Sequence, residues 1–308
     1  MRKIAMVLAA VLTLGACGTG TTPPGGDTSS GSGPSRTVKH AMGDTKVPDK
    51  PRRVVVLDQD KLDTMFSLGL TPVGATLGSD SPTMPKYLGS AFAAVKTVGT
   101  LQEPDLDAIR AVKPDLILGS KFRQEKFYDE LSTIAPTVFT ELVGITWKDN
   151  FLLDADALGK KPEAQALLDK YTARAAGLKR TSQKVSVVRF RPDEIRVYGP
   201  DSFCGIVLKD AGVPRPDRQL LADKKDKRFD KVSPERVQEV DGDVIFVSAY
   251  GDKATQQQSQ MTTGPLWTKL GAVQAGQVYT VDDETWMTGI GVTAANKILD
   301  DLTTHLKA

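Results

Sequence analysis

Asp107-Ala-Ile-Arg-Ala-Val-Lys-Pro-Asp-Leu-Ile-Leu-Gly-Ser120 contains the signals of one helix and one strand in succession. Ile109 and Val112 recur at helical spacing, and Pro114 interrupts the helical pattern. The apolar run that follows Asp115 is short and continuous, as in strands that are buried on both faces of a parallel sheet. The segment therefore predicts a helix, a tight turn and a parallel strand.

Glu235-Arg-Val-Gln-Glu-Val-Asp-Gly-Asp-Val-Ile-Phe-Val-Ser248 repeats this pattern at one constant offset. Any two helix–strand units share their apolar positions, because helices and strands have fixed periods. This repeat also shares the leading acidic residue, the aspartate before the strand and the serine after it. We therefore expect two lobes of similar structure.

Strands and helices alternate on both sides of these two segments, which predicts an α/β fold with mostly parallel sheets. A short hairpin is expected first, over residues 38–47. The expected strands are 54–57, 72–76, 115–119, 136–140, 185–190, 195–198, 243–248 and 278–281. The expected helices are 60–68, 104–112, 124–134, 203–211 and 291–306. Residues 147–183 keep a helical period throughout, and Pro162 falls in the first turn of the second, longer helix of this stretch.

The N-terminus has the composition of an export signal. Arg2 and Lys3 precede an apolar run at 4–14, which is shorter than the roughly 20 residues that span a bilayer. The ending Leu-Gly-Ala-Cys17 resembles a bacterial lipobox, which implies that Cys17 is acylated and becomes the new N-terminus. An ordinary secretory signal or a short membrane helix is the alternative. Residues 18–35 are almost entirely Gly, Ser, Thr and Pro, which predicts a flexible tether.

The predicted fold class is α/β, with two Rossmann-like lobes joined by a long rigid helix. The expected parts are a signal peptide at 1–16, a lipid-anchored flexible linker at 17–36, an N-terminal lobe at 37–148, an interlobe helix at 149–184 and a C-terminal lobe at 185–308. The length of 308 residues agrees with two lobes rather than one.

Composition excludes several functional classes. The chain has 40 Lys+Arg against 38 Asp+Glu, and two of the basic residues lie in the leader, so a nucleic-acid binder is not expected. Only two histidines occur, His40 and His305, which excludes a metal site built from several imidazoles. Acylation of Cys17 would leave Cys204 without a disulfide partner, and we expect Cys204 to be a small core residue. Nucleophile-elbow and phosphate-loop motifs are absent from the sequence.

The candidate ligand-binding residues follow the predicted strands, because ligands of open α/β sheets bind beyond the carboxyl ends of the strands. This set combines cations with aromatic side chains, which suits a large oxygen-rich ligand. The candidates are Gln59, Lys121, Arg123, Trp147, Arg189, Tyr198, Phe203, Tyr250, Trp286 and Met287.

Each of these residues also has a structural interpretation. Lys121 and Arg123 are compatible with a solvated helix start, and Arg189 with a structural salt bridge. The aromatic candidates and Met287 are compatible with core positions, and Trp147 with a residue that only anchors the long helix. Sequence alone leaves both interpretations open.

The order of several short motifs resembles that of the iron–siderophore substrate-binding lipoproteins of bacterial ABC importers. The resemblance extends over residues 37–308. The motifs are the lipobox, Arg53-Val-Val-Val-Leu57, Val98-Gly-Thr100, Glu103-Pro-Asp-Leu106, Lys113-Pro-Asp-Leu-Ile117, Tyr128-Asp-Glu-Leu131, Val232-Ser-Pro-Glu235, and Trp286 followed by Ala294-Ala-Asn296 and Leu299-Asp-Asp-Leu302.

This resemblance implies the class III periplasmic-binding-protein fold and a shallow cleft between the lobes. It implies that the ligand is a ferric siderophore whose chelator fills the coordination shell of the iron, so no cofactor and no metal-ligating residue of the protein is expected. The family's cation pair corresponds to Lys121 and Arg123. Tyr198-Gly-Pro-Asp-Ser202 is followed by Phe203, where catecholate binders commonly have arginine, which favours a hydroxamate or mixed hydroxamate/carboxylate siderophore. Haem, a cobalamin and a membrane-anchored α/β enzyme are the alternatives.

The resemblance also implies the partners. They are an ABC permease dimer with its ATPase, the ferric siderophore and the membrane. The lipid anchor is expected to hold the protein at the extracytoplasmic face of the cell membrane. The protein is expected to be a monomer that binds no nucleic acid. Permease docking is assigned to Glu103, Asp107 and Glu235, although acidic residues at helix N-termini are also favoured by the helix dipole.

Overall fold

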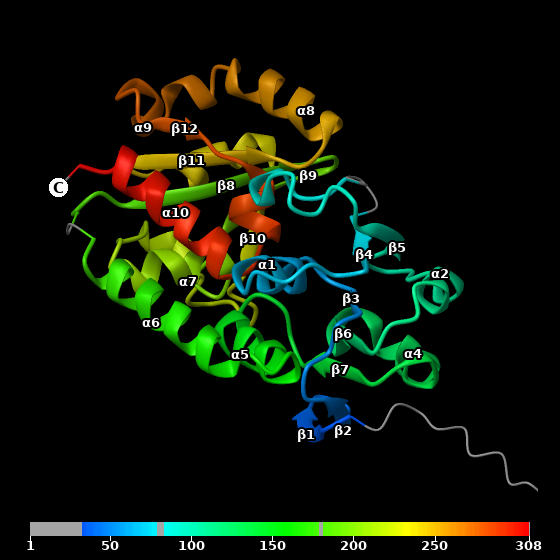
Figure 1. Ribbon diagram of the computed structural model, residues 1–308. Coiled ribbons are helices and arrows are strands. Elements are labelled where there is room, and N and C mark those ends of the chain that lie inside the picture. The colour runs from blue at the N-terminus through cyan, green and yellow to red at the C-terminus, as the bar shows by residue number, and fades with distance from the viewer. Residues whose placement is uncertain (1–32, 79–82, 179–180, 308) are drawn as a thin grey trace, which may run out of the picture. The chain divides into compact units, whose positions relative to one another are not determined.

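Two five-stranded sheets organise the chain between Pro34 and Ala308, which forms one compact unit (Figure 1). The computed structural model describes residues 33–78, 83–178 and 181–307. The predicted signal peptide, Cys17 and the linker as far as residue 32 lie outside the described residues.

The first sheet is entirely parallel, with the order β5-β4-β3-β6-β7. A hairpin of β1 (Ser35–His40) and β2 (Gly43–Pro48) precedes it, as expected. Its strands are β3 (Val54–Val56), β4 (Gly74–Leu77), β5 (Lys96–Thr100), β6 (Leu116–Ser120) and β7 (Thr137–Thr140). Its helices are α1 (Gln59–Ser67), α2 (Leu106–Ala111), α3 (Lys121–Gln124) and α4 (Tyr128–Ile134), with 3-10 turns at Lys86–Leu88 and Glu125–Phe127.

The second sheet is mixed, with the order β10-β9-β8-β11-β12. Its β8, β11 and β12 are parallel, whereas β9 and β10 continue the sheet in antiparallel pairs. The strands are β8 (Val185–Arg191), β9 (Glu194–Tyr198), β10 (Phe229–Val232), β11 (Val244–Ala249) and β12 (Val278–Thr280). The helices are α7 (Phe203–Asp210), α8 (Asp252–Thr262), α9 (Gly271–Gln274) and α10 (Val292–His305). Shorter helical segments are the 3-10 helices Asp217–Leu220, Pro234–Val240 and Trp267–Lys269 and the π-helical turn Glu284–Thr288.

The internal repeat is present in both sheets. Helix α2 leads into β6, and the 3-10 helix Pro234–Val240 leads into β11. The aspartate before each strand caps a neighbouring strand: Asp115 accepts hydrogen bonds from the backbone amides of Arg52 and Arg53, and Asp243 accepts one from that of Lys184. The second copy forms a 3-10 helix where an α-helix was expected. Its buried Val237 and Val240 take the positions of Ile109 and Val112 in the first copy.

The connection between the sheets falls within the predicted interlobe segment 149–184 and its N-terminal flank, where Pro162 indicated a second, longer helix. It consists of α5 (Trp147–Ala157) and α6 (Lys161–Ala176), and Pro162 lies in the first turn of α6 as expected. Gly159 ends the first helix with φ of +71°, and a Cβ atom there would lie 2.4 Å from the Asp49 carbonyl oxygen. This close approach requires glycine and breaks the helix. The lobe boundaries at 148 and 185 stay predictions.

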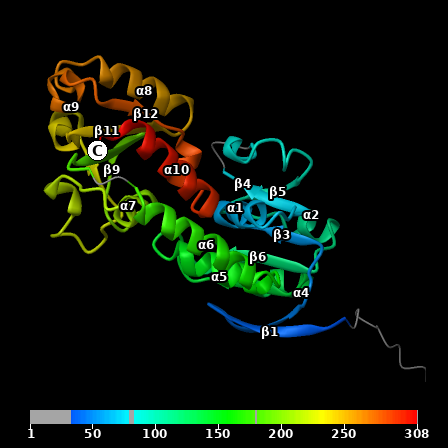
Figure 2. The same ribbon diagram turned by 60° about the vertical axis from the view of Figure 1, so that its left-hand side comes forward.

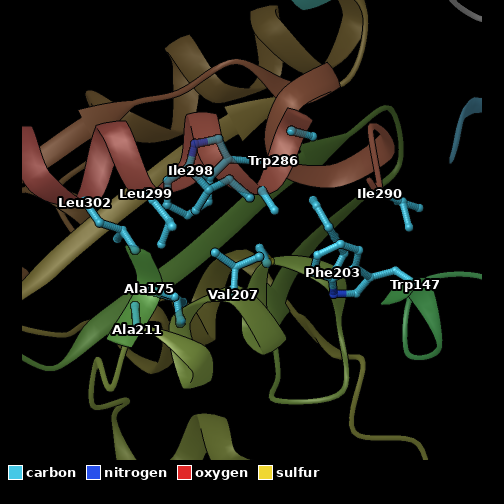
Figure 3. Packing of buried hydrophobic residues seen from close by; sticks show 14 of the residues in the cluster. Trp147, Ala175, Phe203, Val207, Ala211, Trp286, Ile290, Ile298, Leu299 and Leu302 are labelled. Atoms are coloured by element: carbon cyan, nitrogen blue, oxygen red, sulfur yellow. The ribbon is translucent and has the colours of Figure 1, made fainter. Parts of the chain in front are cut away.

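Apolar side chains cover both faces of each sheet. Helix α5 belongs to two clusters: its Trp147 and Phe151 pack with the second sheet, and its Ala157 packs with the first. The second-sheet cluster also contains α6, α7 and α10, with Trp286 and Phe203 among the largest side chains (Figure 3). Both ribbon views place the start of α10 beside α1, so these two helices join the two halves (Figure 2).

Candidate functional site

Residues from both sheets line a cavity of about 450 Å³. This volume is in the range of small-molecule sites. The first half of the chain contributes Gln59, Gly78, Leu101, Gln102, Phe122, Arg123, Val143 and Gly144. The second half contributes Arg189, Arg191, Arg196, Tyr198, Asp201, Ser202, Phe203, Arg228, Phe229, Tyr250, Met287, Thr288 and Ile290.

Five guanidinium groups dominate the chemistry of this wall, and Asp201 supplies the one carboxylate among these described lining residues. Guanidinium groups donate several hydrogen bonds in one plane and bind carboxylates in a bidentate manner. The cavity is therefore built to receive an oxygen-rich anion.

In the first half, Arg123 is held by a buried carboxylate. Its Nε donates to Asp58 Oδ2 at 2.7 Å, and the Ser120 hydroxyl, at the end of β6, donates to the same oxygen at 3.1 Å. Asp58 follows β3 and caps α1 through the Gln59 amide. The negative charge of Asp58 raises the pKa of Arg123, so this guanidinium stays charged beside the cavity.

The second half repeats this arrangement with different strands. Arg189, near the end of β8, donates to both oxygens of Asp283, at 2.7 and 2.5 Å. The Ser248 hydroxyl, at the end of β11, donates to Asp283 at 2.9 Å. In each half, the serine that the internal repeat shares thus supports a carboxylate that orients one arginine.

The three remaining arginines form the outer part of the wall. Arg191 and Arg196 both pair with Glu194, and Arg228 pairs with Asp226. The Arg196 guanidinium lies 3.8 Å from the centre of the Phe229 ring. Tyr250 faces Arg189 and Arg191 at 4.8 and 5.3 Å, which is cation–π geometry.

Arg189 lies directly opposite Arg196 in the antiparallel ladder between β8 and β9. Like charges at directly opposed positions destabilise a sheet. The pairing persists here because the buried Asp283 holds the Arg189 guanidinium and the partly exposed Glu194 holds that of Arg196. Two cations are thereby kept side by side in the cavity wall, which favours an anionic ligand over a neutral one.

Most of the predicted ligand-binding residues line this cavity. They are Gln59, Arg123, Arg189, Tyr198, Phe203, Tyr250 and Met287. Sequence reasoning found them because the carboxyl ends of both sets of strands converge on one site.

Three predicted residues lie outside this lining, and their part in ligand binding stays a prediction. Lys121 points away and pairs with Glu141 at 3.0 Å. Trp147 is 1% exposed and packs edge-on against Tyr171 and Phe203 in the core. Trp286 is 0% exposed, stacks on Phe246 and donates its indole hydrogen to Asp301. Both tryptophans take the structural role that sequence analysis had left open.

Sequence reasoning did not select the outer arginines. Arg191 and Arg196 had one usable signal: with Arg189 they carry positive charge on both sides of a predicted hairpin whose other positions are mostly apolar. No sequence signal pointed to Arg228 or Phe229, since β10 was not predicted. Their place in the site depends on the antiparallel pairing of β10 with β9.

The predicted docking acids are exposed. Asp107 is 95% exposed and accepts a hydrogen bond from Arg110, and Glu103 pairs with Lys126. Glu235 lies in the second copy of the repeat, in the 3-10 helix Pro234–Val240. Cys204 is buried in the core, as expected.

Two further properties concern the described ranges 33–78, 83–178 and 181–307. Within them, no group of three or more His, Cys, Asp or Glu side chains is placed to hold a metal ion. None of the helices in these ranges has both the length and the apolar character needed to cross a membrane.

The sequence pattern of the family described as periplasmic binding protein matches residues 54–285. The chain belongs to the periplasmic binding protein family. A Bacillus subtilis (strain 168) member named probable siderophore-binding lipoprotein YfiY is 40% identical over 97% of this chain and 95% of its own. The Fe(3+)-citrate-binding protein YfmC of the same organism is 32% identical, over 87% of this chain and 85% of its own.

Solved structures show the same binding-protein fold. Staphylococcus aureus SirA complexed with staphyloferrin B has a TM-score of 0.75 and 34% identity, and the match covers 88% of this chain and 99% of SirA. The α/β class and the two-sheet architecture that the sequence predicted are therefore confirmed. In this periplasmic binding protein, the arginine cavity lies at the ends of strands from both sheets.

Proposed function

We propose that this periplasmic binding protein is the extracytoplasmic solute-binding component of an ABC importer, and that it captures a ferric siderophore and delivers it to the permease. The observation that carries the proposal is the opposed pair Arg189 and Arg196 in a wall of five arginines. The relatives named for siderophore and ferric citrate binding support the same function. The protein binds its cargo without converting it.

The charge of the cavity refines the class of siderophore. A neutral tris-hydroxamate complex has no carboxylate to accept from the guanidinium donors that the protein's own carboxylates leave free, such as those of Arg191, so it lacks these charge-assisted hydrogen bonds. A chelator that contains carboxylate or hydroxycarboxylate groups supplies such partners. Of the two classes expected from the sequence, we therefore favour the mixed hydroxamate/carboxylate complex, together with purely carboxylate ones, over the simple hydroxamate.

The remaining partners follow from the same proposal. Cys17 carries the lipid anchor, the residues from Cys17 to the start of β1 at Ser35 form the tether, and the binding domain works as a monomer at the extracytoplasmic face of the membrane. Glu103, Asp107 and Glu235 face arginines of the permease dimer. Their exposure supports this assignment, because docking requires acids that a partner can reach from solvent.

Calorimetric titration of the purified protein tests the function and the ligand class together. The probes are the ferric complexes of a citrate-based dihydroxamate, citrate, a linear tris-hydroxamate and a tris-catecholate, with haem and the iron-free chelators as controls. We expect the citrate-based complexes to bind most tightly. Added salt should lower their affinity for the protein, because salt screens the charges that attract them. Tightest binding of the tris-hydroxamate would refute the ligand class, and failure of all ferric complexes would refute the function.

A further inference from the structure

A second hollow of about 300 Å³ opens beside the arginine cavity. It shares Phe122, Val143, Asp201 and Arg228 with the cavity wall, so the two spaces adjoin each other. We refer to this second space as the annex. It is also lined by Leu142, Ile145, Lys225, Asp226 and Lys227.

The annex gathers apolar surface that the rest of the described chain avoids exposing. The large hydrophobic side chains that are exposed in the described ranges are Phe122 (53%), Leu142 (42%), Ile145 (43%), Leu220 (42%) and Leu266 (47%). The first three of these line the annex. Scattered exposed hydrophobic residues are ordinary, but a cluster of them marks a surface that binds something apolar.

Two hydrogen bonds from α5 and its N-terminal flank hold the loop that carries this apolar surface. Asn150, which is buried in α5, donates its amide to the Leu142 carbonyl oxygen at 2.7 Å. The Thr146 hydroxyl donates to the same oxygen at 3.3 Å. These bonds fix the backbone between Leu142 and Ile145, so the two side chains are held outward and do not fold into the core.

The opposite side of the annex is cationic. Lys225 and Lys227 flank Asp226, which forms the bidentate pair with Arg228. The Arg228 guanidinium lies 6.0 Å from the centre of the Phe122 ring and so stands at the junction between annex and cavity. An occupant of the annex therefore meets an apolar floor, while an anionic group attached to it meets arginines.

We propose that the annex receives an apolar arm of the same siderophore whose anionic, iron-bearing head occupies the arginine cavity. The proposal rests on the proposed function and adds that the cargo is amphiphilic, with an acyl chain or a long aliphatic spacer. The four lining residues that the annex shares with the cavity favour one molecule that extends across both spaces.

A pair of chelators that differ only in their arm tests this proposal. The ferric complexes of a citrate-based dihydroxamate with N-acetyl groups and of its N-octanoyl analogue are titrated against the full protein by calorimetry, below the concentration at which the acylated complex forms micelles. Each methylene that is buried on binding strengthens binding about fourfold. We therefore expect the octanoyl complex to bind at least about tenfold more tightly than the acetyl complex.

Two variants locate this gain in affinity. The double variant Leu142→Ser, Ile145→Ser removes apolar surface from the annex and leaves the arginine cavity intact. It should reduce octanoyl-complex affinity about tenfold and change acetyl-complex affinity less than about twofold. Leu220→Ser is the matched control, because Leu220 is equally exposed but lines neither space. Circular dichroism and thermal unfolding check that all variants are folded.

Three results would overturn the proposal: equal affinity of the two complexes, an unchanged octanoyl advantage in the annex variant, or the same loss in the Leu220→Ser control. These outcomes are distinct from failure of the proposed function. If the acetyl complex binds and the arm adds nothing, only the annex assignment is wrong. If neither ferric complex binds, the proposed function is wrong as well.

Discussion

The arginine side chains of the cavity are oriented before any ligand arrives. Asp58 and Asp283 each hold one guanidinium from behind, and Ser120 and Ser248 support these carboxylates. An arginine that is already fixed loses little rotamer freedom when it binds an anion. The paired carboxylates also lower the net charge of the wall, so recognition depends on directed hydrogen bonds as well as on long-range attraction.

Arg191 is the cavity arginine with the weakest internal support, and its replacement gives a clean test. Its Nε lies 3.7 Å from Glu194, beyond hydrogen-bonding range, so its donors are available to a ligand. A hydrogen bond to a charged group contributes about 1.5–3 kcal/mol. We expect Arg191→Gln to weaken binding of a ferric citrate-type complex about tenfold or more, as measured by calorimetry.

Lys121→Gln provides the control for this prediction. It also removes one positive charge, but Lys121 pairs with Glu141 and does not line the cavity. Its affinity should stay within about twofold of the wild type, since surface pairs contribute little. Equal losses in the two variants would show that bulk charge, and not contact with Arg191, governs binding.

The site was partly predictable at this scale. Arg123, Arg189 and Tyr250 were found because position after a strand is visible in the sequence. Trp147 and Trp286 were selected although they are buried outside the lining, because an aromatic residue near a strand end has the same sequence signal in a core as in a site. Arg228 could not be found, because only strand pairing brings it to the cavity.

The beginning of α10 shows how one element depends on another that is distant in the sequence. The two carboxylate oxygens of Asp63, in α1, accept hydrogen bonds from the backbone amides of Thr293 and Ala294, both at 2.9 Å. The Tyr87 hydroxyl donates to the same carboxylate at 3.0 Å. A Cβ atom on Gly291 would lie 2.4 Å from Asp63, so the approach requires glycine. A residue of the first half therefore caps the last helix of the second.

This cap predicts a pH-dependent contribution to stability. Burial raises the pKa of Asp63 from its ordinary 3.8 to about 6, although hydrogen bonds from Thr293, Ala294 and Tyr87 act to lower it. The folded state then binds this proton more tightly than the unfolded state, so the contribution is complete below about pH 3.8 and is lost as the pH rises through about 6. Asp63→Asn should therefore destabilise the protein more at about pH 4 than at about pH 8, by up to about 3 kcal/mol.

Urea unfolding of wild type and variant at the two pH values measures this difference, and other titrating groups cancel in the comparison. Asp169→Asn is the control, because Asp169 lies on the exposed side of α6. A loss of stability that is the same at both pH values would mean that Asp63 keeps its charge in the folded state throughout this range.

Elements with strong apolar periods were predicted, and elements without them were missed. Strand β10 (Phe229–Val232) buries only Val232, and α8 (Asp252–Thr262) buries only Ala254. Strand β5 (Lys96–Thr100) likewise buries only Val98. Such segments are stabilised by the sheet or helix beside them, so their own sequence carries little signal. The break between α5 and α6 was visible through Pro162, but the approach of Gly159 to Asp49 was not, because it depends on a contact between distant segments.

At the scale of the whole molecule, the repeat places one exposed acid in each half. Asp107 and Glu235 occupy equivalent positions in the two copies. If they dock to the permease, Asp107→Lys or Glu235→Lys should abolish uptake of radiolabelled ferric siderophore by cells, while calorimetry shows unchanged binding. The physical reason is that reversed charge would repel the arginines expected on the permease.

Asp169→Lys makes the matching change on α6 and should leave uptake intact. Normal import by both docking variants would remove the assignment of Asp107 and Glu235. Loss of import by the Asp169 variant as well would indicate that net charge, and not a docking contact, is responsible.

The fluorescence of the buried tryptophans should report whether a ligand occupies the cavity. Trp147 contacts the ring of Phe203, and Trp286 directly precedes Met287, so both lie immediately behind side chains of the cavity wall. Trp267, the remaining tryptophan of the sequence, packs on Phe190 across the second sheet. Ferric chelates absorb where indole emits, so excitation can pass to a bound complex without contact. Light emitted by Trp147 and Trp286 then reports filling of the cavity, while neither side chain needs to be altered or labelled.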